Sequence, residues 1–94
     1  MAYKVRYTPQ ALGDLHFIFK DVAEHNPRAA SAVKSRIRKR IESLALFPMS
    51  GPETATPGLR MLVVGRYPYL IFYEIDEAAK QVAIVHIRHA SRDR

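Results

Sequence analysis

The hydrophobic pattern changes its period along the chain, and this change constrains the fold more than any other feature. Between Thr8 and Pro48 the apolar residues recur every three or four positions, as on one face of a helix. After Gly58 they form short runs rich in aromatic and β-branched residues, which is typical of strands. A chain of 94 residues can bury one modest hydrophobic core. We therefore expect a single α+β domain over residues 1–94.

Two helices are predicted in the first half, each beginning with a capping residue followed by proline. Thr8-Pro9 begins the first, which ends near Glu24-His25, and Asn26-Pro27 begins the second, which ends before Pro48. The predicted apolar stripes comprise Leu12, Leu15, Ile18 or Phe19 and Val22, and then Ala30, Val33, Ile37, Ile41, Leu44 and Ala45. Because one or two residues join the helices, they should form an antiparallel hairpin.

Four strands are predicted, at residues 3–7, 59–64, 67–75 and 82–89. Short turns, one of them Gly65-Arg66, join the last three, which favours an antiparallel meander with the first strand at its edge. The predicted fold is β-α-α-β-β-β, with the helical hairpin packed on one face of an antiparallel sheet. The segment between Pro48 and Gly58 is a loop long enough to indicate a binding role or mobility.

The charge balance indicates the kind of partner. Fifteen Lys and Arg residues against nine Asp and Glu give a net charge of +6, which favours nucleic acid, the ribosome or an acidic protein segment. A basic domain without an anionic partner is the alternative. The chain has no cysteine and no apolar run of membrane-spanning length, so we expect a cytoplasmic protein that does not enter a membrane.

Strand parity predicts which side chains the open face of the sheet displays. In the last strand, we expect Ala83, Val85 and Ile87 to face the core, and Val82, Ile84, His86 and Arg88 to face away from the helices. Arg60, which shares a face with Leu62 and Val64, is expected to join His86 and Arg88 there. The expected basic groove is completed by Arg66 in the hairpin turn and by His89 and Arg92 at the end of the last strand. A solvated strand face is the alternative.

Three further groups of residues, one basic, one aromatic and one of histidines, could have a functional role or a purely structural one. Five of the seven residues from Lys34 to Arg40 are basic, which fits either a solvated helix face or contact with phosphates. The aromatic residues Tyr67, Tyr69, Phe72 and Tyr73 fit either the core or base stacking, and the core is the commoner use. His86 and His89 should lie on opposite faces, and neither a metal site nor another cofactor is expected.

The ordered set of segments resembles the RelE/ParE superfamily of type II toxins over nearly the whole chain. The resemblance rests on Thr8-Pro9-Gln10-Ala11 with Leu15, Phe47-Pro48-Met49-Ser50-Gly51, Leu59-Arg60-Met61-Leu62-Val63, Tyr67-Pro68-Tyr69-Leu70-Ile71-Phe72-Tyr73-Glu74, and residues 82–89 followed by Arg92. It implies a growth-inhibiting toxin, of the kind that stabilises plasmids, neutralised by an acidic cognate antitoxin of ParD type or similar.

The resemblance implies one of two activities. ParE-like members poison DNA gyrase and are not enzymes, and the ending from His86 to Arg92 resembles theirs. RelE-like members cleave mRNA at the ribosome, and in that case Arg60, His86, Arg88 and His89 would be the catalytic candidates. Such enzymes commonly place a tyrosine in the C-terminal segment, whereas this chain has none after Tyr73. We therefore favour the gyrase inhibitor, with the ribonuclease as the alternative.

Overall fold

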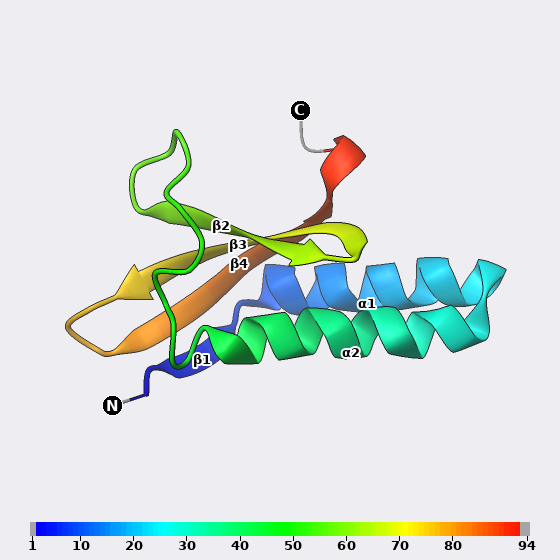
Figure 1. The fold of residues 1–94 in the computed structure, drawn as a ribbon, viewed down its shortest axis with the longest axis horizontal. Coiled ribbons are helices and arrows are strands. Elements are labelled where there is room, and N and C mark those ends of the chain that lie inside the picture. Colours follow the sequence, from blue (N-terminus) through cyan, green and yellow to red (C-terminus); the bar gives the residue numbers. More distant parts are fainter. Residues whose placement is uncertain (1, 93–94) are drawn as a thin grey trace.

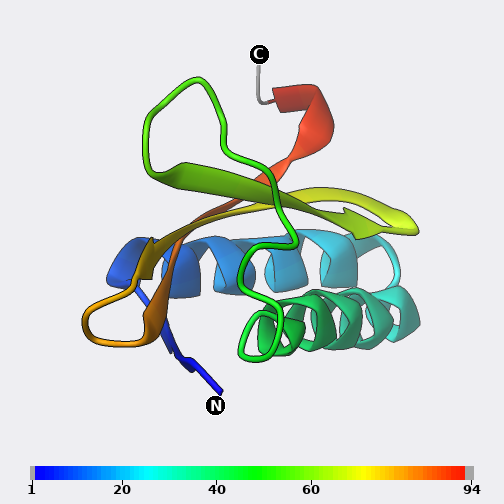
Figure 2. The same ribbon diagram turned by 60° about the vertical axis from the view of Figure 1, so that its left-hand side comes forward.

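The computed structural model describes residues 2–92, which form two helices packed against a four-stranded sheet (Figures 1 and 2). The elements are β1 (Lys4–Tyr7), α1 (Pro9–His25), α2 (Pro27–Ser43), β2 (Leu59–Gly65), β3 (Tyr67–Asp76), β4 (Gln81–His89) and the 3₁₀ turn η1 (Ala90–Arg92). Both helices lie on one side of the sheet, and the long loop before β2 rises beyond its other side. The predicted order of elements is confirmed.

The strands follow the order β1-β4-β3-β2. β2, β3 and β4 are antiparallel neighbours and β1 joins an edge of this meander, as expected. That edge is β4, and β1 runs parallel to it, so the sheet is mixed and not wholly antiparallel. A short turn can join two neighbouring strands only if they are antiparallel. In the sequence, however, both helices separate β1 from the other three strands. The direction of β1 is therefore free of the constraint that orients the other three.

The core fills the space between the helices and one face of the sheet. From the helices it takes Ala11, Leu15, Ile18, Val33, Ile37, Ile41 and Leu44. From the strands it takes Leu62, Val64, Tyr69, Ile71, Tyr73, Val82, Ile84 and Ile87. The predicted stripes are confirmed except at two positions. Leu12 is 53% exposed because it lies to one side of the buried face of α1, and Ala45 lies beyond the end of α2, is only partly buried and is not part of the core. Tyr69 and Tyr73 belong to the core, as expected.

A β-bulge in β4 overturns half of the parity prediction for this strand. Phe72 pairs with His86 while the next residue of β3, Tyr73, pairs with Ile84, so Val85 is an extra residue. Val82 and Ile84 are fully buried in the core, opposite to the prediction, and Val85 is not part of the core. Ile87 is buried as expected. Counting by two fails across a bulge because the inserted residue exchanges the two faces.

Thr8 connects the start of α1 to the sheet. Its side-chain oxygen accepts from the Ala11 amide at 3.2 Å, which caps the helix, and donates to the Ile84 carbonyl at 2.7 Å. Its own amide donates to the same carbonyl at 3.1 Å. Asn26 caps α2 in the same way by accepting from the Ala29 amide at 3.2 Å, but this site is exposed, and within residues 2–92 the Asn26 side chain makes no hydrogen bond to the sheet. Thr8 therefore carries a tertiary contact in addition to a cap.

We expect Thr8→Ala to lower the free energy of unfolding by about 1–2 kcal/mol, since it removes a cap and a bond to the sheet. Asn26→Ala, which removes a cap alone, should cost about 1 kcal/mol or less. Thr8→Ser should restore most of the loss. Urea unfolding of the three variants measures these differences, and equal losses in Thr8→Ala and Asn26→Ala would contradict the tertiary role.

Candidate functional site

The long loop is tied to the sheet by the hydroxyl group of Tyr73. This side chain is fully buried, and its hydroxyl donates to the Pro48 carbonyl at 2.7 Å and accepts from the Gly51 amide at 2.9 Å. Burial raises the pKa of Tyr73, so the hydroxyl keeps its proton and remains a donor at neutral pH. One side chain in the centre of the sheet thus determines where the loop starts.

Gly51 lets the loop approach the sheet closely. A Cβ atom at this position would lie 2.5 Å from the Met61 carbonyl oxygen and 2.9 Å from the Tyr73 hydroxyl, closer than these atoms can approach. The loop then runs beside β2, where the Met61 amide donates to the Pro52 carbonyl at 3.1 Å. On the same edge strand, the Arg40 guanidinium donates to the Val63 carbonyl at 3.0 Å. Both contacts cover polar groups of an edge strand.

Arg60 also helps to hold the loop against the sheet, and its side chain does not lie where the sequence predicted. It pairs with Tyr73 across β2 and β3, so its side chain lies on the helix side of the sheet, and its Nη1 donates to the Gly51 carbonyl at 2.7 Å. The prediction that Arg60 shares the open face with His86 and Arg88 is wrong. The parity that placed it beside Leu62 was correct, but Leu62 faces the core.

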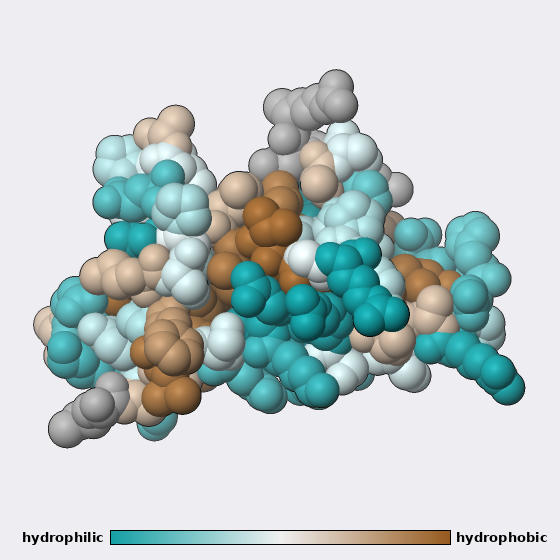
Figure 3. Space-filling model, in the orientation of Figure 1, coloured by the Kyte–Doolittle hydropathy of each residue, from teal (hydrophilic) through white to brown (hydrophobic). Residues whose placement is uncertain are grey.

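His86 and Arg88 do come together on the open face, as predicted. Both line a groove of about 330 Å³ whose other walls are Thr54, Ala55, Thr56, Leu59 and Phe72. The ring of Phe72 meets the imidazole of His86 edge to face, with centroids 6.4 Å apart. The Nδ1 atom of His86 is buried and lacks a hydrogen-bond partner within residues 2–92. In Figure 3 the notch above the sheet, between the loop and the C-terminal turn, has a hydrophobic floor.

The remaining predicted site residues lie elsewhere. Arg66 is exposed in the β2–β3 turn, where both it and Gly65 have positive φ angles, as a tight hairpin requires. His89 lies on the helix side of the sheet, opposite to His86 as predicted, and its Nδ1 is 2.7 Å from the Ser91 hydroxyl. The backbone of Arg92 belongs to η1, while its side chain lies outside the described part of the structure.

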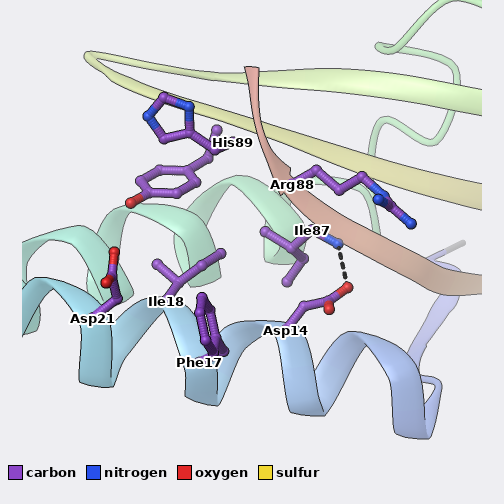
Figure 4. Close-up of a pocket in the computed structure, with 8 residues that line it drawn as sticks. Asp14, Phe17, Ile18, Asp21, Ile87, Arg88 and His89 are labelled. Carbon is purple, nitrogen blue, oxygen red and sulfur yellow. Dashed lines mark hydrogen bonds between the residues drawn. The ribbon is translucent and has the colours of Figure 1, made fainter. Parts of the chain in front are cut away.

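A second pocket, of about 170 Å³, lies between α1 and the end of β4 (Figure 4). Its lining comprises Asp14, Phe17, Ile18, Asp21, Tyr69, Ile87, Arg88 and His89. Both carboxylate oxygens of Asp14 already accept hydrogen bonds, Oδ1 from the Gln10 side-chain amide and Oδ2 from the Ile87 backbone amide, each at 3.0 Å. This pocket was not predicted from the sequence. The two aspartates lie seven positions apart, so they share a helix face, but that spacing alone does not reveal which strand faces them.

The open-face groove offers a guanidinium, an imidazole, two threonine side chains and an apolar wall. Such a set can bind an anionic or aromatic group and orient it. Within residues 2–92, no cluster of three or more His, Asp or Glu side chains is placed to hold a metal ion. None of the helices in that range is long and apolar enough to cross a membrane.

Three comparisons place this chain among known proteins. The family model described as "ParE toxin of type II toxin-antitoxin system, parDE" matches residues 5–94. The Toxin RelE2 of Caulobacter vibrioides is 39% identical over 89 residues, which cover 95% of this chain and 97% of that protein. The structure of the chromosomal ParDE toxin–antitoxin system from P. aeruginosa contains a chain with a TM-score of 0.83 and 21% identity, covering 94% of this chain and 96% of that one.

A solved toxin–antitoxin complex is also similar. The RelBE2 complex of Mycobacterium tuberculosis contains a chain with 25% identity and a TM-score of 0.65, covering 95% of this chain and 99% of that one. The described fold, with two helices packed on a four-stranded sheet, is therefore that of the RelE/ParE structures.

We expect Arg60→Ala to lower the free energy of unfolding by about 1.5–3 kcal/mol, because a charged donor is removed from the Gly51 carbonyl. Arg88→Ala is the matched control. That side chain is exposed, so its removal should change stability by about 0.5 kcal/mol or less. Thermal unfolding of both variants is the measurement. An Arg60→Ala protein as stable as Arg88→Ala would contradict the structural role assigned to Arg60.

Proposed function

The chain belongs to the ParE toxin family of type II toxin–antitoxin systems, and from that premise we propose that it arrests growth by poisoning DNA gyrase. The observation that carries the proposal is the match of the ParE family model to residues 5–94, which includes every described element except the start of β1. The proposed target places its action in the cytoplasm.

The contents of the open-face groove support an interaction protein over an enzyme. Cleavage of RNA needs a base for the 2′-hydroxyl and an acid for the leaving oxygen. His86 is the one imidazole that lines the groove, and Arg88 cannot act as a base because a guanidinium does not lose its proton. Arg60 and His89, the other catalytic candidates, lie on the far side of the sheet.

We further propose that a cognate antitoxin encoded beside this gene neutralises the toxin. The similar P. aeruginosa and M. tuberculosis chains come from a toxin–antitoxin system and a toxin–antitoxin complex. This chain exposes large apolar side chains that a partner could cover, namely Leu12 and Phe17 on α1, and Leu46, Phe47 and Met49 after α2. Its charge of +6 favours an acidic partner segment that folds as it binds.

A ribosome-dependent mRNA endonuclease is the alternative. The relative that favours it is the Toxin RelE2 of Caulobacter vibrioides, which is 39% identical to this chain. In that case His86 and Arg88 would carry the chemistry in the groove they share, with the imidazole as the proton acceptor and the guanidinium beside the phosphate.

The deciding experiment adds the purified full chain to purified gyrase and supercoiled plasmid DNA. We expect cleaved plasmid to accumulate, and brief expression without antitoxin to give DNA breaks and filamentous cells while mRNA stays intact. Arg88→Ala should weaken gyrase inhibition by about tenfold, the effect of losing roughly 1.4 kcal/mol at an interface. Lys4→Ala, an exposed change on β1, is the matched control and should be as inhibitory as the wild type.

Two results would reject the gyrase proposal. One is rapid mRNA cleavage on expression with gyrase unaffected in the purified assay, and loss of that cleavage in a His86→Ala variant would then favour the alternative. The other is unimpaired growth after expression of a folded, soluble chain, which would reject both activities.

A further inference from the structure

The positive charge of the chain is concentrated on one helix. α2 contains the six cations Arg28, Lys34, Arg36, Arg38, Lys39 and Arg40, and its acidic residue is Glu42. This helix therefore carries five of the six net positive charges of the whole sequence. Figure 3 shows strongly hydrophilic side chains gathered over the middle of α2. The open-face groove described above does not use them.

These cations are not neutralised within the fold. Across residues 2–92, the ion pair found within 4 Å joins Lys80 to Glu77, far from α2 in the sequence. Arg36, Arg38 and Lys39 are exposed, although Arg38 also lies beside the Tyr7 hydroxyl, and Arg40 donates to the Val63 carbonyl. Stability alone does not require so many unpaired like charges on neighbouring turns, because like charges one turn apart repel each other.

Three of the cations converge on a groove beside α1. The groove encloses about 500 Å³ and is lined by Phe19, Ser31, Lys34, Ser35, Arg38, Lys39 and Glu42. The Lys34 ammonium lies 5.0 Å from the centre of the Phe19 ring, so an aromatic face holds this charge in place. Two hydroxyl groups, from Ser31 and Ser35, add neutral hydrogen-bond donors of the kind that contact phosphate oxygens.

We propose that this surface, defined as Lys34, Arg38 and Lys39 with the hydroxyls of Ser31 and Ser35, binds the phosphate backbone of double-stranded DNA. The proposal is independent of the gyrase activity. An α-helix advances about 6 Å between positions i and i+4, so Lys34 and Arg38 offer successive cations along one line. Contacts of this kind fix a protein on DNA without reading its sequence.

The same surface fits other anionic partners less well. Single-stranded nucleic acid binds through open aromatic faces, whereas the Phe19 ring in this groove lies under the Lys34 ammonium. A membrane-surface helix exposes an apolar face, whereas the apolar residues of α2, such as Ile37, are buried in the core. A protein partner would need an apolar anchor, and the one apolar side chain that lines this groove, Phe19, lies under the Lys34 ammonium.

The test measures the affinity of the full chain for a fluorescent DNA duplex of about 20 base pairs across roughly 50–200 mM salt. Two double variants of equal net charge are compared, Arg38→Gln with Lys39→Gln on α2, and Lys4→Gln with Arg6→Gln on β1. All four positions are exposed, so both variants should remain folded, which thermal unfolding verifies.

We expect the α2 variant to bind more weakly and to lose about two units from the slope of log affinity against log salt, one for each phosphate contact removed. The β1 variant should keep the wild-type slope. Equal losses in the two variants would overturn the proposal, because a diffuse positive field would then explain the binding. It would also be overturned by undetectable wild-type binding at the lowest salt, or by tighter binding to single-stranded DNA, single-stranded RNA or phosphatidylglycerol vesicles than to the duplex.

Discussion

The hydroxyl group of Tyr73 is the contact on which the functional face depends. It sits at the end of a fully buried side chain in the second strand from the edge, and it reaches the carbonyl of Pro48 and the amide of Gly51. Arg60, on the neighbouring strand β2, donates a hydrogen bond to the Gly51 carbonyl. A loop with three prolines and two glycines is thereby anchored at its first turn, and its tip, Thr54 to Thr56, becomes a wall of the groove that contains His86 and Arg88.

This attachment divides the basic residues by role. Arg60 holds the loop from the core side of the sheet, Arg40 covers the edge strand, and Arg88 is displayed to solvent in the groove. Three cations of α2, namely Lys34, Arg38 and Lys39, line a separate groove on the helix side of the sheet. A domain with a single thin core can present two unlike faces in this way, because helices cover one side of the sheet and a loop borders the other.

Local signals in the sequence predicted most of the architecture. The pairs Thr8-Pro9 and Asn26-Pro27 marked both helix starts because capping depends on a few adjacent residues. The bulge at Val85 was not predictable, since an inserted residue has no local signature in a strand of apolar residues. Arg60 shows a different limit. Its parity with Leu62 was read correctly, but the side of the sheet that Leu62 faces depends on where the helices pack. The pocket beside Asp14 was missed for the same reason.

The central claim, that Tyr73 holds the loop which shapes the functional groove, is tested most directly by amide hydrogen exchange at Gly51. In the wild-type chain we predict that this amide exchanges slowly, because it donates to a buried hydroxyl, and that in Tyr73→Phe it exchanges at least about tenfold faster, a loss of roughly 1.4 kcal/mol of local protection. The amide of Ile71, in the middle of β3, should change much less. A Gly51 amide that already exchanges in the wild type as fast as an exposed loop amide would contradict the account.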